Sequence, residues 1–101
     1  MYKSWQDRFG TRSAVWSERK NAVLQEERGL SFEAVVSAIE NGQLLDDIAH
    51  SSAGKFSHQR ILVVRMDGYA CAVPYVFDES EVFLKTIYKS RELHARYGQR
   101  S

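Results

Sequence analysis

The side chains of this sequence that could do chemistry are concentrated near its C-terminal end, where basic residues predominate. Residues 82–101 carry five basic side chains against one glutamate, a local charge of +4. Lys85 lies in an alternating, strand-like run, and Ser90 and Arg91 follow where a helix-like pattern begins. Lys and Arg stabilise the extra negative charge of a pentacoordinate phosphodiester transition state, and a helix N-terminus offers N–H groups to phosphate. The pattern therefore points to phosphodiester chemistry.

A second set of candidate residues flanks the polar loop 51–59. His50 ends one predicted strand and Arg60 begins the next, and in an antiparallel hairpin these two ends lie side by side. His50 would give or take a proton near neutral pH, and Arg60 would assist Lys85 and Arg91 in stabilising the phosphorane. The alternative for all of these residues is that they are ordinary strand-end charges and a surface histidine.

Further residues are expected to contact the substrate rather than react with it. Tyr88 would stack on a base or orient the substrate, and Ser90, Lys89 and His58 would provide polar contacts. A charge run of this kind is also typical of a solvated helix face.

Several other kinds of site are excluded by residue type and spacing. The three histidines lack the spacing of a metal site, so no metal and no cofactor is expected. No glycines fall at the spacing of a phosphate loop. Cys71 is the single cysteine, lies in an apolar strand and is expected to be buried and unreactive. Asp46 and Asp47 are adjacent in a predicted strand, so they point to opposite faces and cannot share a proton.

Length and composition indicate one small domain. The chain has 101 residues, 44% of them hydrophobic, and a formal net charge of +1, which argues against general disorder. This near-neutral total hides an acidic middle, since residues 29–59 carry a charge of −3. The sequence lacks a bilayer-spanning run and a secretory signal, so we expect no membrane association and a cytoplasmic location.

The predicted elements define an α+β fold with two N-terminal helices, an antiparallel meander sheet of about four strands and a C-terminal helix. Ser17 and Gly29 bound the first helix, and Ser31 and Gly42 bound the second. The predicted strands are 44–49, 60–66, 69–77 and 82–88, with a hairpin at Asp67-Gly68. A short strand at 14–16 precedes them, and a helix from Ser90 to about residue 98 follows them. Residues 1–13 are treated as an N-terminal extension, and residues 14–101 as a single domain.

Two segments resemble the opening of the BrnT-type toxins. They are Trp16-Ser17-Glu18-Arg19-Lys20-Asn21 and the junction Glu27-Arg28-Gly29-Leu30-Ser31-Phe32-Glu33. The later block from Phe83 to Arg91 is similar to the family's final strand and its exit into a C-terminal helix, which ends near Tyr97. The resemblance covers about residues 14–98 and depends on these blocks occurring in the right order.

The resemblance implies a type II toxin–antitoxin toxin with a RelE-like fold, which cleaves RNA without a metal ion and slows translation. Its expected partners are a cognate antitoxin protein, messenger RNA and, as a further candidate, the ribosome. Arg91 matches the family's arginine after the last strand, and Lys85 lies near a basic position of that strand. The region of His50, His58 and Arg60 departs from the family pattern, so their roles come from the residues alone. Two other hypotheses stay open, namely a non-catalytic module that binds nucleic acid or an acidic partner, and an inactive toxin relic.

Overall fold

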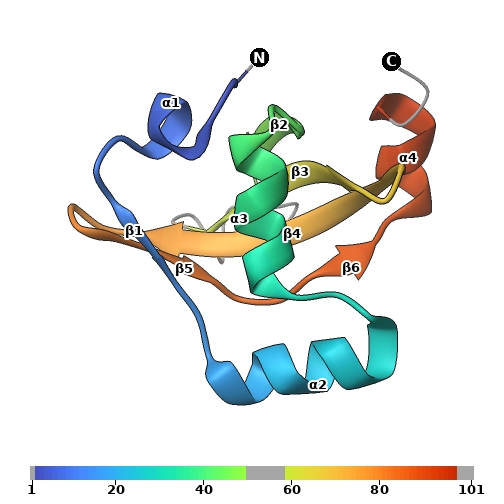
Figure 1. Cartoon of the computed structure of the whole chain (residues 1–101). Helices are drawn as coiled ribbons and strands as arrows, with labels where there is room; N and C mark the ends of the chain where they lie inside the picture. The colour runs from blue at the N-terminus through green and yellow to red at the C-terminus, as the bar shows by residue number, and fades with distance from the viewer. Residues whose placement is uncertain (1, 50–58, 98–101) are drawn as a thin grey trace.

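A computed structural model describes residues 2–49 and 59–97, which form an α+β fold around a mixed six-stranded sheet (Figure 1). The helices are α1 (Trp5–Phe9), α2 (Glu18–Arg28), α3 (Phe32–Glu40) and α4 (Arg91–Tyr97). The strands are β1 (Ser13–Val15), β2 (Leu44–Ala49), β3 (Arg60–Met66), β4 (Tyr69–Phe77), β5 (Glu81–Leu84) and β6 (Tyr88–Lys89). The predicted α+β class is therefore confirmed.

The sheet differs from the predicted antiparallel meander in its edges. Its order is β1-β5-β4-β3-β2. Strand β6 also pairs with β4, next to residues 71–72, whereas β5 pairs with residues 75–77 of the same strand. Strands β2 to β5 pair antiparallel, but β1 joins the outer side of β5 in parallel. A short strand from the start of the chain therefore makes the sheet mixed.

Helices cover the two faces of the sheet unequally. The main core lies on the face crossed by α3 and α1, where Phe9, Phe32, Ile39 and Leu62 are fully buried (Figure 1). The second face carries a smaller core of Ile61, Val63, Ala70, Ala72 and Leu93, in which Leu93 comes from α4. Because α4 is a short helix over the start of β4, it covers one end of the second face.

The segment before residue 14, set apart as an extension, contributes to the main core. Trp5 and Phe9 on α1 are buried, and their rings lie 4.6 Å apart. The Trp5 indole N–H donates to the Arg12 carbonyl at 2.8 Å, which satisfies the polar atom of the buried ring.

The junction between α2 and α3 follows the predicted capping pattern. The hydroxyl groups of Ser17 and Ser31 cap α2 and α3, and Gly29 ends α2 in the left-handed conformation with φ of +67°. Asn21 is buried with 3% exposure; its side chain accepts the Phe32 N–H at 2.8 Å and donates to Glu33 at 2.7 Å. These contacts lock the two helices together and explain several residues of the family resemblance.

The predicted strand 82–88 is interrupted opposite Pro74. Tyr75 pairs with Leu84, and Ala72 pairs with Tyr88. Between these two pairs β4 has two residues, whereas the segment that joins β5 to β6 has three, residues 85–87. The Lys85 N–H donates to the Pro74 carbonyl at 2.9 Å, but proline has no N–H to return. The hydrogen-bond ladder between β4 and the segment 82–88 therefore breaks opposite Pro74, and this segment carries one extra residue. The extra residue is a β-bulge, and it reverses the alternation of buried and exposed side chains after Lys85.

This reversal corrects the predicted faces of the strand. The alternation places Tyr88 on the side of Val82 and Leu84, with Ile87 on the other. In the structure Ile87 is fully buried beside Leu84 in the main core, and Tyr88 is 40% exposed. The bulge therefore turns the Tyr88 ring toward solvent.

Candidate functional site

A basic and aromatic pocket lies at the sheet edge beside β6. It has a volume of about 420 Å³ and is lined by Arg28, Leu30, Tyr88 and Lys89. Two of these residues come from the α2–α3 junction and two from β6, which lie near each other in Figure 1. We call these four residues the edge pocket.

The junction places Arg28 at the pocket. Arg28 is the last residue of α2, and the turn at Gly29 allows Leu30 to bury its side chain in the main core. The Arg28 Nη1 donates to the Ile87 carbonyl at 2.9 Å. One side of the guanidinium is thereby fixed to the chain before β6, so its charge stays beside Tyr88 and Lys89.

Strand β6 supplies an aromatic ring and a second cation. Tyr88 pairs with Ala72 and Lys89 with Cys71, so the two side chains leave the short strand on opposite faces. The Lys89 ammonium lies 5.7 Å from the centre of the Tyr69 ring, within the range of a cation–π contact. An exposed aromatic ring with two cations suits a ligand that combines a planar group with an anion.

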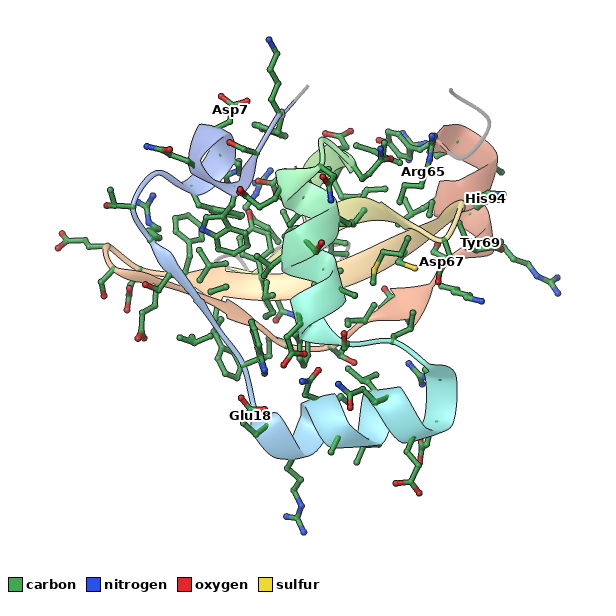
Figure 2. The ribbon with its side chains drawn as sticks, viewed as in Figure 1. Asp7, Glu18, Arg65, Asp67, Tyr69 and His94 are labelled. Atoms are coloured by element: carbon green, nitrogen blue, oxygen red, sulfur yellow. The ribbon has the colours of Figure 1, made fainter. Side chains whose placement is uncertain are left out.

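Beyond Lys89, His94 stacks on Tyr69 at the corner where α4 meets β4 (Figure 2). The ring centres are 4.0 Å apart with an interplanar angle of 8°, and the Ala70 N–H donates to His94 Nδ1 at 3.3 Å. Since Nδ1 accepts this hydrogen bond, the neutral imidazole carries its proton on Nε2. Lys89, Tyr69 and His94 thus form a row that leads away from the edge pocket.

The structure brings together part of the predicted site. Tyr88 and Lys89 line the edge pocket, and Arg91 follows two residues later as an exposed residue at the start of α4. The Ser90 hydroxyl accepts the Leu93 N–H at 3.1 Å, so it serves as the predicted helix cap. Lys85 is exposed in the chain between β5 and β6.

The remaining predicted residues are His50, His58 and Arg60. His50 and His58 lie outside the described residues. Arg60 is the first residue of β3 and pairs with Tyr75 of β4, whereas Tyr88 pairs with Ala72 of β4. Tyr75 and Ala72 are three residues apart, which is about 10 Å along the strand at the usual rise per residue.

Arg60 belongs to a separate charged cluster centred on Asp47. The Asp47 side chain is 2% exposed and forms ion pairs with Arg8 and with Arg60, whose Nε lies 3.0 Å away. The Tyr75 hydroxyl donates to Asp47 at 2.7 Å, and the Arg60 Nη2 donates to the Asp47 carbonyl at 2.9 Å. These four residues are named the Asp47 cluster.

The Asp47 cluster raises the pKa of its two arginines and of its tyrosine. The hydrogen bond to Asp47 raises the pKa of Arg60, and burial together with Asp47 raises the pKa of Tyr75. For Arg8, desolvation alone would lower the pKa, but Asp47 and Tyr75 outweigh it and raise the pKa. None of these three groups is thereby shifted toward proton transfer at neutral pH, which favours a structural role linking α1 to the sheet.

The neighbouring carboxylate confirms the prediction that the two aspartates point apart. Asp46 accepts the Tyr97 hydroxyl at 2.6 Å on the second face, whereas Asp47 has its partners on the main-core face. Cys71 is fully buried, as predicted, and burial raises the pKa of its thiol.

Comparisons of this chain with protein-family models, curated proteins and solved structures found no match. Within residues 2–49 and 59–97, no group of His, Cys, Asp or Glu side chains is arranged to hold a metal ion. In the same part of the chain no helix is long and apolar enough to cross a membrane.

Sequence reasoning missed Arg28, Tyr69 and His94. Arg28 could have been considered from the sequence, because it directly precedes Gly29, the predicted end of the first helix. The turn at Gly29 determines where the Arg28 side chain lies. Tyr69 and His94 are separated by 25 positions and meet only because α4 folds back over β4. No local pattern indicates that contact.

Proposed function

We propose that this protein is the toxin of a type II toxin–antitoxin system, a BrnT-type protein of RelE-like fold that cleaves RNA without a metal ion and inhibits translation. The observation that carries the proposal is the edge pocket, which is lined by Arg28, Lys89 and the exposed Tyr88. Cationic and aromatic side chains in one pocket suit an RNA strand, since they bind phosphate and stack on an unpaired base. The resemblance to BrnT-type toxins supports the same reading.

In the proposed reaction the RNA supplies its own nucleophile. The 2′-oxygen attacks the adjacent phosphorus and loses its proton to a base, which forms a pentacoordinate phosphorane. The bond to the 5′-oxygen then breaks, and that oxygen takes up a proton. The products are a 2′,3′-cyclic phosphate and a 5′-hydroxyl end, and no metal ion or cofactor is needed.

The residues around the edge pocket divide this work. Arg28 and Lys89 bind the phosphates that flank the cleaved bond, and Tyr88 stacks on a base. Arg91 and Lys85 stabilise the phosphorane, whose extra negative charge two cations bind more strongly than they bind the ground state.

Proton transfer is proposed for a histidine. The sequence suggests His50, with Arg60 assisting at the same sheet end. Among the described residues His94 is the better placed, because it lies beside Tyr69, whose ring Lys89 approaches. Its Nε2 proton is free of the Ala70 hydrogen bond and is the one that would reach a leaving oxygen.

RNA cleavage by the purified protein in excess EDTA tests the proposal. The wild type is expected to release fragments with cyclic-phosphate ends, and Arg91→Ala is expected to slow cleavage by about a hundredfold, as for loss of one transition-state cation. Tyr88→Ala should weaken RNA binding by about tenfold, since a stacked base contributes ~1–3 kcal/mol. Arg19→Ala, at an exposed position on α2, is the matched control and should behave as the wild type.

A wild-type protein that neither cuts RNA nor arrests growth when expressed would contradict the enzyme proposal. Equal cleavage by Arg91→Ala and wild type would contradict the role of Arg91 alone. If His94→Ala retains full cleavage while His50→Ala loses it, proton transfer belongs to His50.

One observation favours a second candidate, a nucleic-acid-binding module without cleavage. Among the described residues, those that line the edge pocket include no histidine or carboxylate, the usual groups for proton transfer, so these residues can bind RNA but leave its cleavage to residues outside the pocket. This candidate also covers an inactive toxin relic. It predicts single-stranded RNA binding with a salt dependence, and Arg28→Ala should reduce the slope of log affinity against log salt by about 0.7. RNA that stays intact under saturating protein would support it.

A further inference from the structure

The second face of the sheet carries an apolar surface at the end opposite α4. Three residues on three adjacent strands lie in one row, because Val15 pairs with Phe83 and Phe83 pairs with Val76. Residues opposite each other in neighbouring strands share a face. We call Val15, Phe83 and Val76 the apolar row.

The apolar row is accessible to a partner. Phe83 is 38% exposed, although its strand neighbours Val82 and Leu84 are fully buried in the main core. Leu93 of α4 belongs to the same apolar cluster as Ile61, Val63 and Ala72 further along this face, and α4 packs mainly against β4. A pocket of about 230 Å³ lies at the row and is lined by Val76, Phe77, Asp78, Glu81 and Phe83.

Carboxylates border one side of the apolar row, at the hairpin. Asp78, Glu79 and Glu81 lie in and beside the β4–β5 turn, and all three are exposed. Arg12 interacts electrostatically with Asp78, and its guanidinium donates to the Asp78 carbonyl and lies over the Phe77 ring, so Glu79 and Glu81 are the carboxylates on which the surface depends. The ring of Phe77 belongs to the other face of the hairpin, because Phe77 pairs with the core residue Val82.

The opposite side of the row, further along β5, carries the reverse charge. Lys85 follows β5 directly and is exposed. The surface therefore has an apolar centre, an acidic side at the hairpin and a basic residue on the other side. A ligand that complements it has an apolar anchor with cationic groups directed toward the hairpin.

We propose that the apolar row and its acidic border form a docking surface for a basic amphipathic segment of another protein. An aliphatic or aromatic side chain of that segment occupies the pocket against Phe83 and Val76, and its Lys or Arg residues pair with Glu79 and Glu81. The proposal does not depend on RNA cleavage, because its pocket and its carboxylates include none of the residues assigned to RNA binding or cleavage.

A labelled, amidated peptide of alternating leucine and arginine is the probe, and fluorescence anisotropy together with amide chemical shifts is the readout. The largest shifts are expected in residues 13–15 and 76–83. Phe83→Ser is expected to weaken binding by about tenfold, as for loss of a central apolar anchor. Val23→Ser, which removes an exposed apolar side chain from α2, is the matched control and should bind as the wild type.

Charge variants keep the test valid if Phe83→Ser fails to fold. The double variant Glu79→Gln and Glu81→Gln should weaken peptide binding at low salt by about fivefold, and the binding affinity should then depend less on salt concentration. The double variant Glu26→Gln and Glu27→Gln on α2 is the charge control. A peptide in which glutamate replaces arginine should not bind.

Three outcomes would overturn the proposal. The first is peptide shifts that map to residues outside the apolar row and the hairpin. The second is equal binding by Glu79→Gln/Glu81→Gln and wild type. The third is concentration-dependent dimerisation of the free protein that Phe83→Ser abolishes, since the occupant of the row is then a second copy of this chain.

Discussion

Replacing Asp47 by asparagine removes one buried negative charge and leaves its two arginine partners in place. The Asp47 side chain is 2% exposed, and it accepts hydrogen bonds from Arg8, Arg60 and Tyr75. Asparagine keeps the volume and one acceptor oxygen, so the hydrogen bond from Tyr75 can persist. What is lost is the charge that compensates two guanidinium groups.

The cost follows from the burial of each partner. Breaking a buried ion pair costs ~3–5 kcal/mol, because an uncompensated charge remains inside the protein. The Arg60 side chain is 37% exposed, so water screens its share, whereas the Arg8 side chain is only 20% exposed. We therefore expect Asp47→Asn to lower the free energy of unfolding by about 3 kcal/mol, or the melting temperature by roughly 10–20 °C for a domain of this size.

Urea unfolding measures this change, followed by tryptophan fluorescence and checked by circular dichroism. Asp46→Asn is the matched control, because Asp46 lies on the same strand and accepts hydrogen bonds from the Tyr97 hydroxyl and the Asp47 N–H. Asparagine keeps one acceptor oxygen, so the cost should stay near ~1 kcal/mol, as for loss of one hydrogen bond. A loss for Asp47→Asn no larger than that for Asp46→Asn would refute the assignment of the Asp47 cluster as the link between α1 and the sheet.

Three further predictions concern groups that the fold buries. Burial and the hydrogen bond to Asp47 raise the pKa of Tyr75 in the folded protein, so the native state keeps a proton that the unfolded chain loses near pH 10. The free energy of unfolding should therefore fall as pH rises above about 10, and it should fall less steeply for Tyr75→Phe. Cys71 should react with an alkylating reagent only at the rate of unfolding, since it is fully buried and its thiol pKa is raised; fast labelling of the native protein would contradict this. Asn21→Ala should lower the free energy of unfolding by about 1–3 kcal/mol, because the buried Phe32 N–H loses its acceptor; a neutral effect in thermal unfolding would contradict this.

The helices and their junction were predictable because local chemistry decides them. Ser17, Gly29 and Ser31 act within one turn of their own positions, through a hydroxyl acceptor or a left-handed backbone conformation. The helical spacing of Phe32, Val35 and Ile39 likewise places all three in the core. Such features need no knowledge of the rest of the chain.

The edge pocket was only half predictable, because a non-local effect decides which way Tyr88 points. Alternation along 82–88 was correct up to Leu84 and then reversed, since Pro74 on the neighbouring strand cannot donate to the ladder. The sequence shows Pro74, but it does not show which residue lies opposite. One added residue is enough to bury Ile87 and expose Tyr88.

The parallel pairing of β1 was unpredictable for a related reason, although the sequence predicts a short strand at 14–16, one residue away from the observed bounds. The segment Ser13–Val15 is too short for its sequence to indicate which strand it pairs with. It pairs with β5, and the paired residues are 68 positions apart in the sequence. The short α1 before it is held by burial of Trp5 and Phe9 and by the ion pair between Arg8 and Asp47. Only the folded sheet reveals these contacts, so the sequence pattern read this segment as an extension.

The residues that carry the resemblance to BrnT-type toxins mostly build the helix junction. Asn21 bonds to both Phe32 and Glu33, and Trp16 stacks on Phe32 with ring centres 5.6 Å apart. These four residues do not line the edge pocket, but Arg28 and Leu30, which belong to the same junction, do. A rigid junction fixes the Arg28 guanidinium against the Ile87 carbonyl, and so sets the distance between its charge and the Tyr88 ring. For the proposed function the junction motif would act through positioning, because it can keep the geometry of the proposed phosphate-binding residue, Arg28, without containing a group that reacts.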